Sequence, residues 1–292
     1  MAFNQLLMDY ARTGGFDAVF VDKGVWIWPG TLRALKDTAR WGLAIHFTPD
    51  AQFLENRSRH FYRALPDYDL AITTKTFEID AYRKAGAPEI KLLLQGHGRH
   101  LAPVDPAGIP ADLRSEVAFV GHCQSAYAVF LKILSARVPL SIWGPGWVRH
   151  ARRNAWAQGV VRNDGMYGAD YACALSGAKI ALGLLSKRIP ETTTTRTFEI
   201  PACGTMLLAE RTEDHQSLFE EGVEAEFFDS AEECADKARF YLADDAARER
   251  IAAAGLRRCR ASGYSTQAQF RTIVDWVAAH RPADGATAKK DV

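Results

Sequence analysis

The 292-residue sequence lacks an excess of charge of either sign, since 36 lysines and arginines stand against 35 aspartates and glutamates. A net charge of +1 provides no broad basic field, so we expect no nucleic-acid partner and no dedicated binding to anionic membranes. No run of 18 apolar residues occurs, which predicts that there is no transmembrane segment. Nothing at the start resembles a signal peptide, and we expect a soluble, cytoplasmic protein.

Glycine, proline and cysteine are also scarce. The 22 glycines and 12 prolines are too few for a fibrous or disordered chain. The five cysteines lie at wide and unequal spacings, at Cys123, Cys173, Cys203, Cys234 and Cys259. They form no CxxC pair and no Cys/His cluster with zinc-ligand spacing, which predicts reduced core thiols and no metal site.

Strand-like and helix-like segments alternate along the chain, which is typical of parallel sheets with helices on both faces. Strands are predicted at 16–22, 43–48, 70–74, 90–95, 117–120, 140–143, 179–184 and 206–209. A stretch rich in proline, residues 100–114, separates two such series. We therefore predict an α/β fold with two Rossmann-like, doubly wound domains, at 1–112 and 113–281, followed by a flexible tail at 282–292.

The segment 187–212, KRIPETTTTRTFEIPACGTMLLAERT, carries the most chemical information. Thr195 and the threonines before it offer hydroxyls that can cap a helix starting at Arg196. A helix N-terminus suits a phosphate, and an anion bound there would offset the unfavourable charge of Arg196 in the first turn. Glu199, one turn later, is suited to accept hydrogen bonds from a ribose diol. The alternative interpretation is a solvated helix start with two unrelated glutamates, Glu191 and Glu199.

Two other patterns are weaker. The sequence GPG at 144–146 suggests a dinucleotide-binding turn, but Arg149 stands where the third glycine is required. Arg149, Arg152 and Arg153 form a small basic run, which we interpret as a solvated face.

The run 196–204, RTFEIPACG, resembles a motif of CgeB-like, group-1-type glycosyltransferases with the GT-B fold. The sequences FVG at 119–121 and IWGPGW at 142–147 also resemble elements of that family, and the likeness covers roughly residues 116–276. It implies a metal-independent, hexosyltransferase-type enzyme that takes a sugar from a nucleotide-diphosphate donor. The acceptor stays open between a glycan, a lipid-linked saccharide and a protein.

The resemblance also implies roles for single residues. The glutamate that matches Glu199 contacts the donor ribose, and the one that matches Glu191 lies near the sugar, where we expect a catalytic role. Arg196, with Lys187 or Arg188, would meet the diphosphate. The other expected donor-binding residues are Gly121, His122, Thr195 and Gly204. The resemblance implies no cofactor besides the nucleotide sugar, which is the donor substrate.

The likeness is weaker before residue 116. His46 and Asp50, in AIHFTPD near the end of a predicted strand, are candidates for acceptor contact or for a general base, because histidine titrates near neutrality. The alternative is a strand-end histidine and a turn aspartate. The resemblance implies that a complete GT-B amino-terminal domain would open with a strand and a glycine-rich turn, whereas this sequence starts at a helix. Two explanations stay open: Met1 is a late start, or the domain is naturally reduced. Two other functions stay open: a catalytically inactive GT-B-like protein that binds a nucleotide or a partner, and a nucleotide-sugar epimerase.

Overall fold

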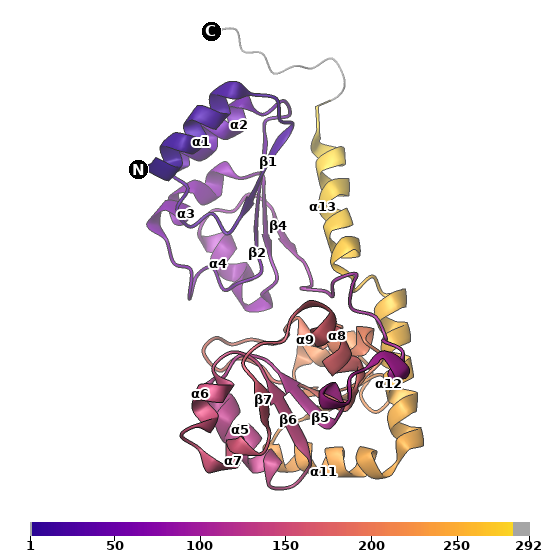
Figure 1. Cartoon of the computed structure of the whole chain (residues 1–292). Helices are drawn as coiled ribbons and strands as arrows, with labels where there is room; N and C mark the ends of the chain where they lie inside the picture. Colours follow the sequence, from indigo (N-terminus) through magenta and orange to yellow (C-terminus); the bar gives the residue numbers. More distant parts are fainter. Residues whose placement is uncertain (1, 283–292) are drawn as a thin grey trace. The chain divides into compact units, whose positions relative to one another are not determined.

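The computed structural model describes residues 2–282, and its contacts divide the chain into two compact units (Figure 1). Unit 1 comprises Met1–Leu94 and Phe270–Val292, and unit 2 comprises Gln95–Gln269. These units differ from the predicted domains 1–112 and 113–281, because the segment from residue 95 onward packs within unit 2 and the end of the chain returns to unit 1. Except for Pro282, the predicted flexible tail at 282–292 lies outside the described residues.

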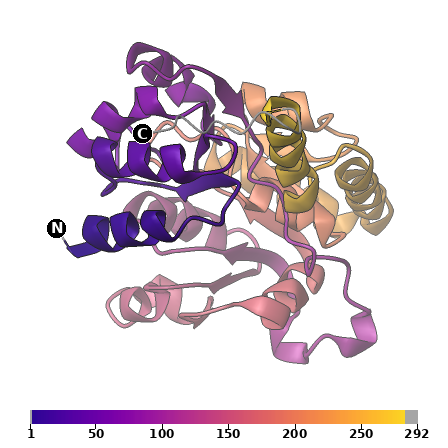
Figure 2. The ribbon, with the colours of Figure 1, turned by 90° about the horizontal axis from the view of Figure 1, so that it is seen from above.

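Unit 1 contains a parallel sheet with the strand order β1-β2-β3-β4. Its strands are β1 (Ala18–Asp22), β2 (Leu43–Thr48), β3 (Leu70–Thr73) and β4 (Ile90–Leu92). Its helices are α1 (Ala2–Thr13), α2 (Pro29–Thr38), α3 (Arg59–Ala64) and α4 (Ile79–Lys84), with most of α13 (Thr266–His280). Helices α1 and α2 lie side by side (Figure 2). Strand β1 forms an edge of the sheet and leaves Phe20 47% exposed, so this strand is not buried on both faces.

Unit 2 contains a parallel sheet with the order β10-β9-β8-β5-β6-β7. Its strands are β5 (Ser115–Val120), β6 (Leu140–Trp143), β7 (Val161–Asn163), β8 (Ala178–Gly183), β9 (Met206–Glu210) and β10 (Glu226–Phe228). Its helices are α5 (Ser125–Ser135), α6 (Trp147–Ala151), α7 (Ala155–Gln158), α8 (Gly168–Ser176), α9 (Arg196–Ala202), α10 (Glu213–Leu218), α11 (Ala231–Ala243) and α12 (Asp245–Ala261). The order reverses between β8 and β5, because the chain adds β6 and β7 on one side and then returns to the other.

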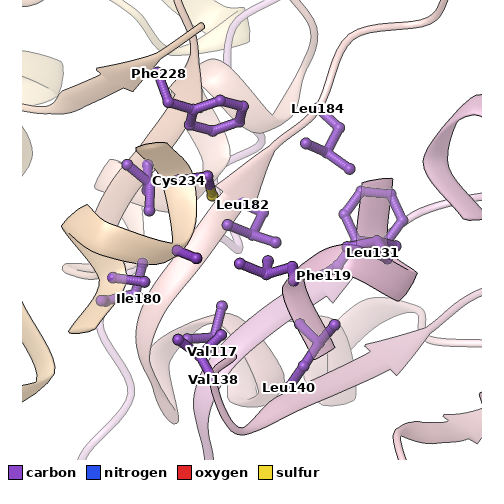
Figure 3. Close-up of a cluster of buried hydrophobic side chains, with 14 of the residues drawn as sticks. Val117, Phe119, Leu131, Val138, Leu140, Ile180, Leu182, Leu184, Phe228 and Cys234 are labelled. Carbon is purple, nitrogen blue, oxygen red and sulfur yellow. The ribbon is translucent and has the colours of Figure 1, made fainter. Parts of the chain in front are cut away.

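The main core of unit 2 lies between the sheet and helices α5 and α11 (Figure 3). Alternate residues of β5 and β8 point into it, including Val117, Phe119 and Leu182, all almost fully buried. Cys234 of α11 lies in the same cluster, and the five cysteines are free thiols, as predicted. The N-terminus of α11 is capped by Ser230, whose hydroxyl accepts a hydrogen bond from the Glu233 amide at 3.1 Å.

Two segments that are distant in sequence pair at the border of unit 2. His97 N donates to the Tyr264 carbonyl at 3.0 Å, and Thr266 N donates to the His97 carbonyl at 2.9 Å. Gly96, at φ 65°, lies so close that a Cβ there would sit 2.9 Å from the Tyr264 carbonyl oxygen. Further along α13, Ile273 and Trp276 pack on the sheet of unit 1, in a cluster with Ile45 of β2.

The predicted α/β class with two parallel sheets is confirmed. Sequence analysis did not predict β7, β10, α3, α6, α7 or α10, which are short elements without a full hydrophobic period. Within the described residues, no helix combines the length and the apolar character that crossing a membrane requires.

Candidate functional site

The reversal of strand order in unit 2 marks the place where a ligand is expected. In open parallel sheets the loops at the carboxyl ends of the strands diverge at such a reversal and leave a crevice. Here the two strands concerned are β5, which ends at Val120, and β8, which ends at Gly183. We call the loops 121–124 and 184–195, with the first turn of α9 that follows, the carboxyl-edge site.

Glycines let the backbone pack closely at this edge. Gly144, directly after β6, has φ 133°, and a Cβ there would lie 2.2 Å from the carbonyl oxygen of Gly121. That carbonyl also accepts a hydrogen bond from the indole nitrogen of Trp147 at 2.8 Å. A Cβ on Gly121 would meet the Arg196 guanidinium at 3.0 Å. The backbone after β5 is therefore packed closely against the turn after β6 and against the Arg196 side chain.

Arg196 bridges the two strands at the reversal. Its guanidinium donates to the Leu184 carbonyl at 2.9 Å and to the Val120 carbonyl at 3.4 Å. It also lies over the Phe119 ring, 5.6 Å from the centroid. Its Nε is buried, without a hydrogen-bond partner in the described part of the chain. Arg196 thus fixes the ends of β5 and β8 and places a positive charge at the reversal of the strand order.

Glu199 is held by a partner that sequence analysis missed. The Tyr171 hydroxyl, from α8, donates to a carboxylate oxygen of Glu199 at 2.6 Å. Burial and the negative charge of Glu199 raise the pKa of Tyr171 well above its usual value, so the phenol keeps its proton and remains a donor. One carboxylate oxygen is thereby used in positioning, while Glu199 itself remains half-buried. No local motif marks Tyr171, because the contact joins helices 28 residues apart.

The loop after β8 is held by carboxylates. Glu191 accepts a hydrogen bond from Ser186 N at 3.1 Å, and Glu210 accepts one from Leu185 N at 2.7 Å. Lys187 forms an ion pair with Glu210. Arg188 is exposed in the same loop. The structure therefore brings Glu191, Lys187 and Arg188 into one ordered segment.

A buried histidine fixes the segment just before α9. Burial lowers the pKa of His215, so its ring is neutral near pH 7. Its Nδ1 lies 2.6 Å from the Glu210 carbonyl and must donate, so its Nε2 accepts from the Thr197 hydroxyl at 2.9 Å. The same Thr197 oxygen accepts from Thr194 N at 3.1 Å. This chain of bonds connects α10 to the first turn of α9.

The prediction that threonine hydroxyls cap α9 is wrong for Thr195. Thr195 occupies the N-cap position but has helical dihedral angles and makes no side-chain capping bond. The Thr194 amide is already bonded to Thr197, so the first turn is partly satisfied internally. The helix is also only seven residues long, so its dipole is a weaker argument for an anion than the sequence suggested.

The comparisons with known proteins agree with this arrangement. The model of a family described as "Glycosyl transferase-like" matches residues 126–275, slightly more than half of the 292-residue chain. The chain belongs to this glycosyltransferase-like family. No curated protein matches.

Solved structures extend the likeness to the whole fold. HepE of Anabaena, crystallised with UDP, aligns with a TM-score of 0.70 at 14% identity, over 94% of this chain and 82% of that one. Sucrose-phosphate synthase of Thermosynechococcus elongatus aligns with a TM-score of 0.67 at 15% identity, over 95% and 77%. A glycosyltransferase of Rickettsia africae aligns with a TM-score of 0.67 at 12% identity, over 95% and 80%. At these identities the likeness establishes a GT-B fold.

Two other residues predicted to bind the donor, His122 and Gly204, take no part in the contacts around Arg196 and Glu199. His122 is exposed in the loop after β5. Gly204 follows α9 at φ 76°, where a Cβ would come within 3.2 Å of Pro103. A glycine is required there because the chain turns at the end of the helix with a positive φ and because Pro103 packs closely against it. The structure therefore places Gly204 in a structural turn.

The two candidates of unit 1 differ from each other. His46 lies in the middle of the buried strand β2 and is fully buried, so it is not the strand-end residue that the sequence suggested. Its Nε2 lies 3.1 Å from the Tyr82 hydroxyl, and burial lowers its pKa to about 3. A side chain without solvent contact cannot meet an acceptor, so we withdraw His46 as a general base. Asp50 lies at the surface after β2 and forms an ion pair with Lys23.

Proposed function

We propose that this chain is a group-1 glycosyltransferase of the CgeB-like type, which binds a nucleotide-diphosphate sugar at the carboxyl-edge site. The observation that supports this most is the placement of Glu199 beside the β5–β8 reversal, held by Tyr171. A carboxylate with one oxygen fixed by a phenol presents its other oxygen in a defined direction, as recognition of a ribose diol requires. HepE, a structural neighbour, has been crystallised with UDP-glucose, which makes UDP-hexoses the first donors to test.

For the other residues of the site we propose the roles that the family resemblance implies. Glu191, in the ordered loop after β8, would lie at the sugar, where a carboxylate stabilises the positive charge of an oxocarbenium-like transition state. The charge of Arg196 at the reversal, with Arg188 in the adjoining loop, would favour the departing diphosphate. Gly121 would let the Arg196 guanidinium lie directly against the backbone after β5, where the donor diphosphate would meet it.

The finer features of this function are also proposals. We propose transfer of a hexose without a bound metal ion, in the cytoplasm, to an acceptor that is a glycan, a lipid-linked saccharide or a protein. Asp50 is retained as a candidate for acceptor contact, because it lies at the surface just beyond the carboxyl end of β2. In the described part of the chain, no three His, Cys, Asp or Glu side chains are grouped so that they could hold a metal ion.

The experiment is a calorimetric titration of the full chain with UDP, GDP, ADP, TDP and CMP. We expect one nucleoside diphosphate to bind selectively. In Glu199→Gln the binding free energy of this nucleotide should weaken by about 1.5–3 kcal/mol, because a charge-assisted hydrogen bond to the ribose is lost. The matched control is Glu232→Gln, an exposed carboxylate of α11 whose ion pair with Arg137 spans 3.7 Å, and it should bind as the wild type does.

The outcomes separate the proposal from its alternatives. Binding of no nucleotide, or equal affinity in Glu199→Gln, would contradict the donor site. Selective binding without release of nucleotide from any sugar donor would favour an inactive binding protein. Epimerised nucleotide sugar formed without an acceptor would identify an epimerase.

A further inference from the structure

A hollow on unit 2 gathers positive side chains from separate parts of the chain. It has a volume of about 600 Å³ and lies between α5 and the α6–α7 segment. Lys132 comes from α5, Arg149 from α6, and Arg153 from the turn that follows α6. We call this site the basic hollow. It shares Cys123 with the loop 121–124 of the carboxyl-edge site, but none of the residues predicted to bind the donor lines it.

These three cations lack the partners that most basic side chains of unit 2 have. Arg137 and Lys179, for example, form ion pairs with nearby glutamates, at 3.7 and 3.0 Å. Within residues 2–282, no ion pair and no side-chain hydrogen bond is formed by Lys132, Arg149 or Arg153. Like charges that share a hollow repel each other, and a bound anion removes that cost.

Acidic side chains do not neutralise the hollow. No carboxylate of the described residues lines it. Asp164 is the acidic residue whose charge acts on Cys123 of the hollow. Its carboxylate accepts a hydrogen bond from Val148 N at 2.7 Å, at the start of α6. Cys123 lines the hollow, and burial raises the pKa of its thiol. The charge of Arg149 lowers that pKa, whereas the charge of Asp164 raises it. Three positive charges therefore face a single, already engaged negative one.

Two further polar side chains add hydrogen-bonding capacity. His150 lines the hollow with its ring between Trp147 and Trp156, 5.6 Å from each, and its Nε2 is buried without a partner in the described part of the chain. Ser125 lines it at the first turn of α5, an eleven-residue helix with no acidic residue and no side-chain cap at that end. The positive end of the α5 dipole thus adds to the charge of the three cations.

We propose that the basic hollow binds the phosphate group of a small phosphorylated ligand, as a second site that is independent of the donor. Its volume is in the range of small-molecule pockets, and residues of both α5 and the α6–α7 segment line it, which favours a small ligand over a membrane surface. Arg149 and Arg153 present guanidinium groups, which suit the oxygens of a phosphate. Trp156 provides an aromatic face against which the non-phosphate part of the ligand, such as a sugar ring, would pack.

The test uses calorimetry on the full chain, in a buffer free of phosphate, with three probes: inorganic phosphate, glucose 6-phosphate, and vesicles of phosphatidylcholine with phosphatidylglycerol. We expect the two soluble probes to bind. The double variant Arg149→Gln/Arg153→Gln should lose at least tenfold in affinity for them. The affinity of that variant for UDP should change less than twofold. Its thermal midpoint should stay within one or two degrees of the wild type, since both side chains are exposed.

The matched control removes the same charge elsewhere. Arg257 and Arg260 are exposed on α12 and form no ion pair with other described residues. Arg257→Gln/Arg260→Gln should bind both soluble probes as the wild type does. An equal loss in this control would show a non-specific charge effect and would overturn the proposal. So would the absence of binding by both soluble probes, or binding of the vesicles alone, which would make the surface a lipid contact.

Discussion

The two parallel sheets of this protein use their carboxyl edges differently. In unit 1 the loop after β2 is closed over the edge by internal bonds: the buried carboxylate of Glu78 accepts from Gln52 N at 2.9 Å and from Phe53 N at 2.7 Å. In unit 2 the corresponding edge holds Glu199 by one oxygen and has glycines at Gly121 and Gly144. One edge is completed by its own side chains, whereas the other is where we propose that a ligand binds.

Strand order explains the difference. The strands of unit 1 follow one another as β1-β2-β3-β4, so neighbouring loops leave the sheet in sequence and pack on each other. In unit 2 the order reverses between β8 and β5, and the loops on either side diverge. The same α/β architecture therefore has in unit 2 a place where a ligand is expected, at the reversal of the strand order. Charged residues at a strand end are a candidate site mainly where such a reversal occurs.

The largest effect is expected from glycine substitutions at the two edges. Gly144→Ala puts a Cβ 2.2 Å from a backbone oxygen at φ 133°, and we expect a loss of roughly 4 kcal/mol in the free energy of unfolding. Gly24→Ala, at the edge of unit 1, meets the movable Val21 side chain at 2.7 Å at φ 66° and should lose about 1–2 kcal/mol. Urea denaturation measures both, with Gly159→Ala as a control that meets no atom within 4 Å. Equal losses at Gly144 and Gly24 would show that the unit 2 edge is not more tightly packed.

Glu78→Gln tests whether the unit 1 edge is structural. The amide side chain cannot accept both backbone bonds in the same way, and we expect a loss of about 3 kcal/mol, since buried amides are left without a charged acceptor. Glu199→Gln should lose less than about 0.5 kcal/mol of stability, because Glu199 is half-buried at the surface. Chemical denaturation of both variants decides the comparison. A Glu199 variant as unstable as the Glu78 variant would mean that both edges serve stability.

The buried histidine of unit 1 makes that unit sensitive to acid. The pKa of His46 falls from 6.5 to about 3, so its neutral form stabilises the native state above pH 6.5, and this contribution is lost as the pH falls toward 3. We expect the wild type to lose about 2 kcal/mol more than His46→Phe between pH 7 and pH 5. The difference between the two proteins isolates His46, because Glu78, whose pKa burial raises, is present in both. Parallel stability curves for the two proteins would refute this assignment.

Sequence patterns predicted the parallel sheets and the start of α9 because these depend on local periodicity. They did not predict the carboxyl-edge site as a set of contacts. Tyr171 was missed because its hydrogen bond to Glu199 joins α8 to α9 across the fold. The bounds of β2 were predicted correctly at 43–48, but His46 was taken to lie near the accessible end of the strand, whereas the structure buries it fully.

The basic hollow shows the same limit of local patterns. Arg149 and Arg153 form a visible run in the sequence, which we interpreted as a solvated face. Lys132 lies on another helix, and its position beside them follows from the packing of α5 against the α6–α7 segment. Whether a basic side chain has an acidic partner depends on residues that are distant in sequence. A short stretch of sequence therefore does not predict it.

The smallest predicted effect is the most specific to the unit 2 edge. Tyr171→Phe removes the hydroxyl that fixes Glu199 but keeps the ring, so stability should change little while nucleotide affinity falls by about 1 kcal/mol, or roughly fivefold. The free carboxylate then samples several rotamers, and ordering it again costs part of the binding energy. Calorimetry with the nucleotide selected by the wild type measures this, and Tyr167→Phe, at an exposed tyrosine just before α8, is the matched control. Combining Tyr171→Phe with Glu199→Gln should cause no further loss, because a positioning residue has no effect once the group that it positions is gone. Additive losses would instead assign Tyr171 its own contact with the ligand.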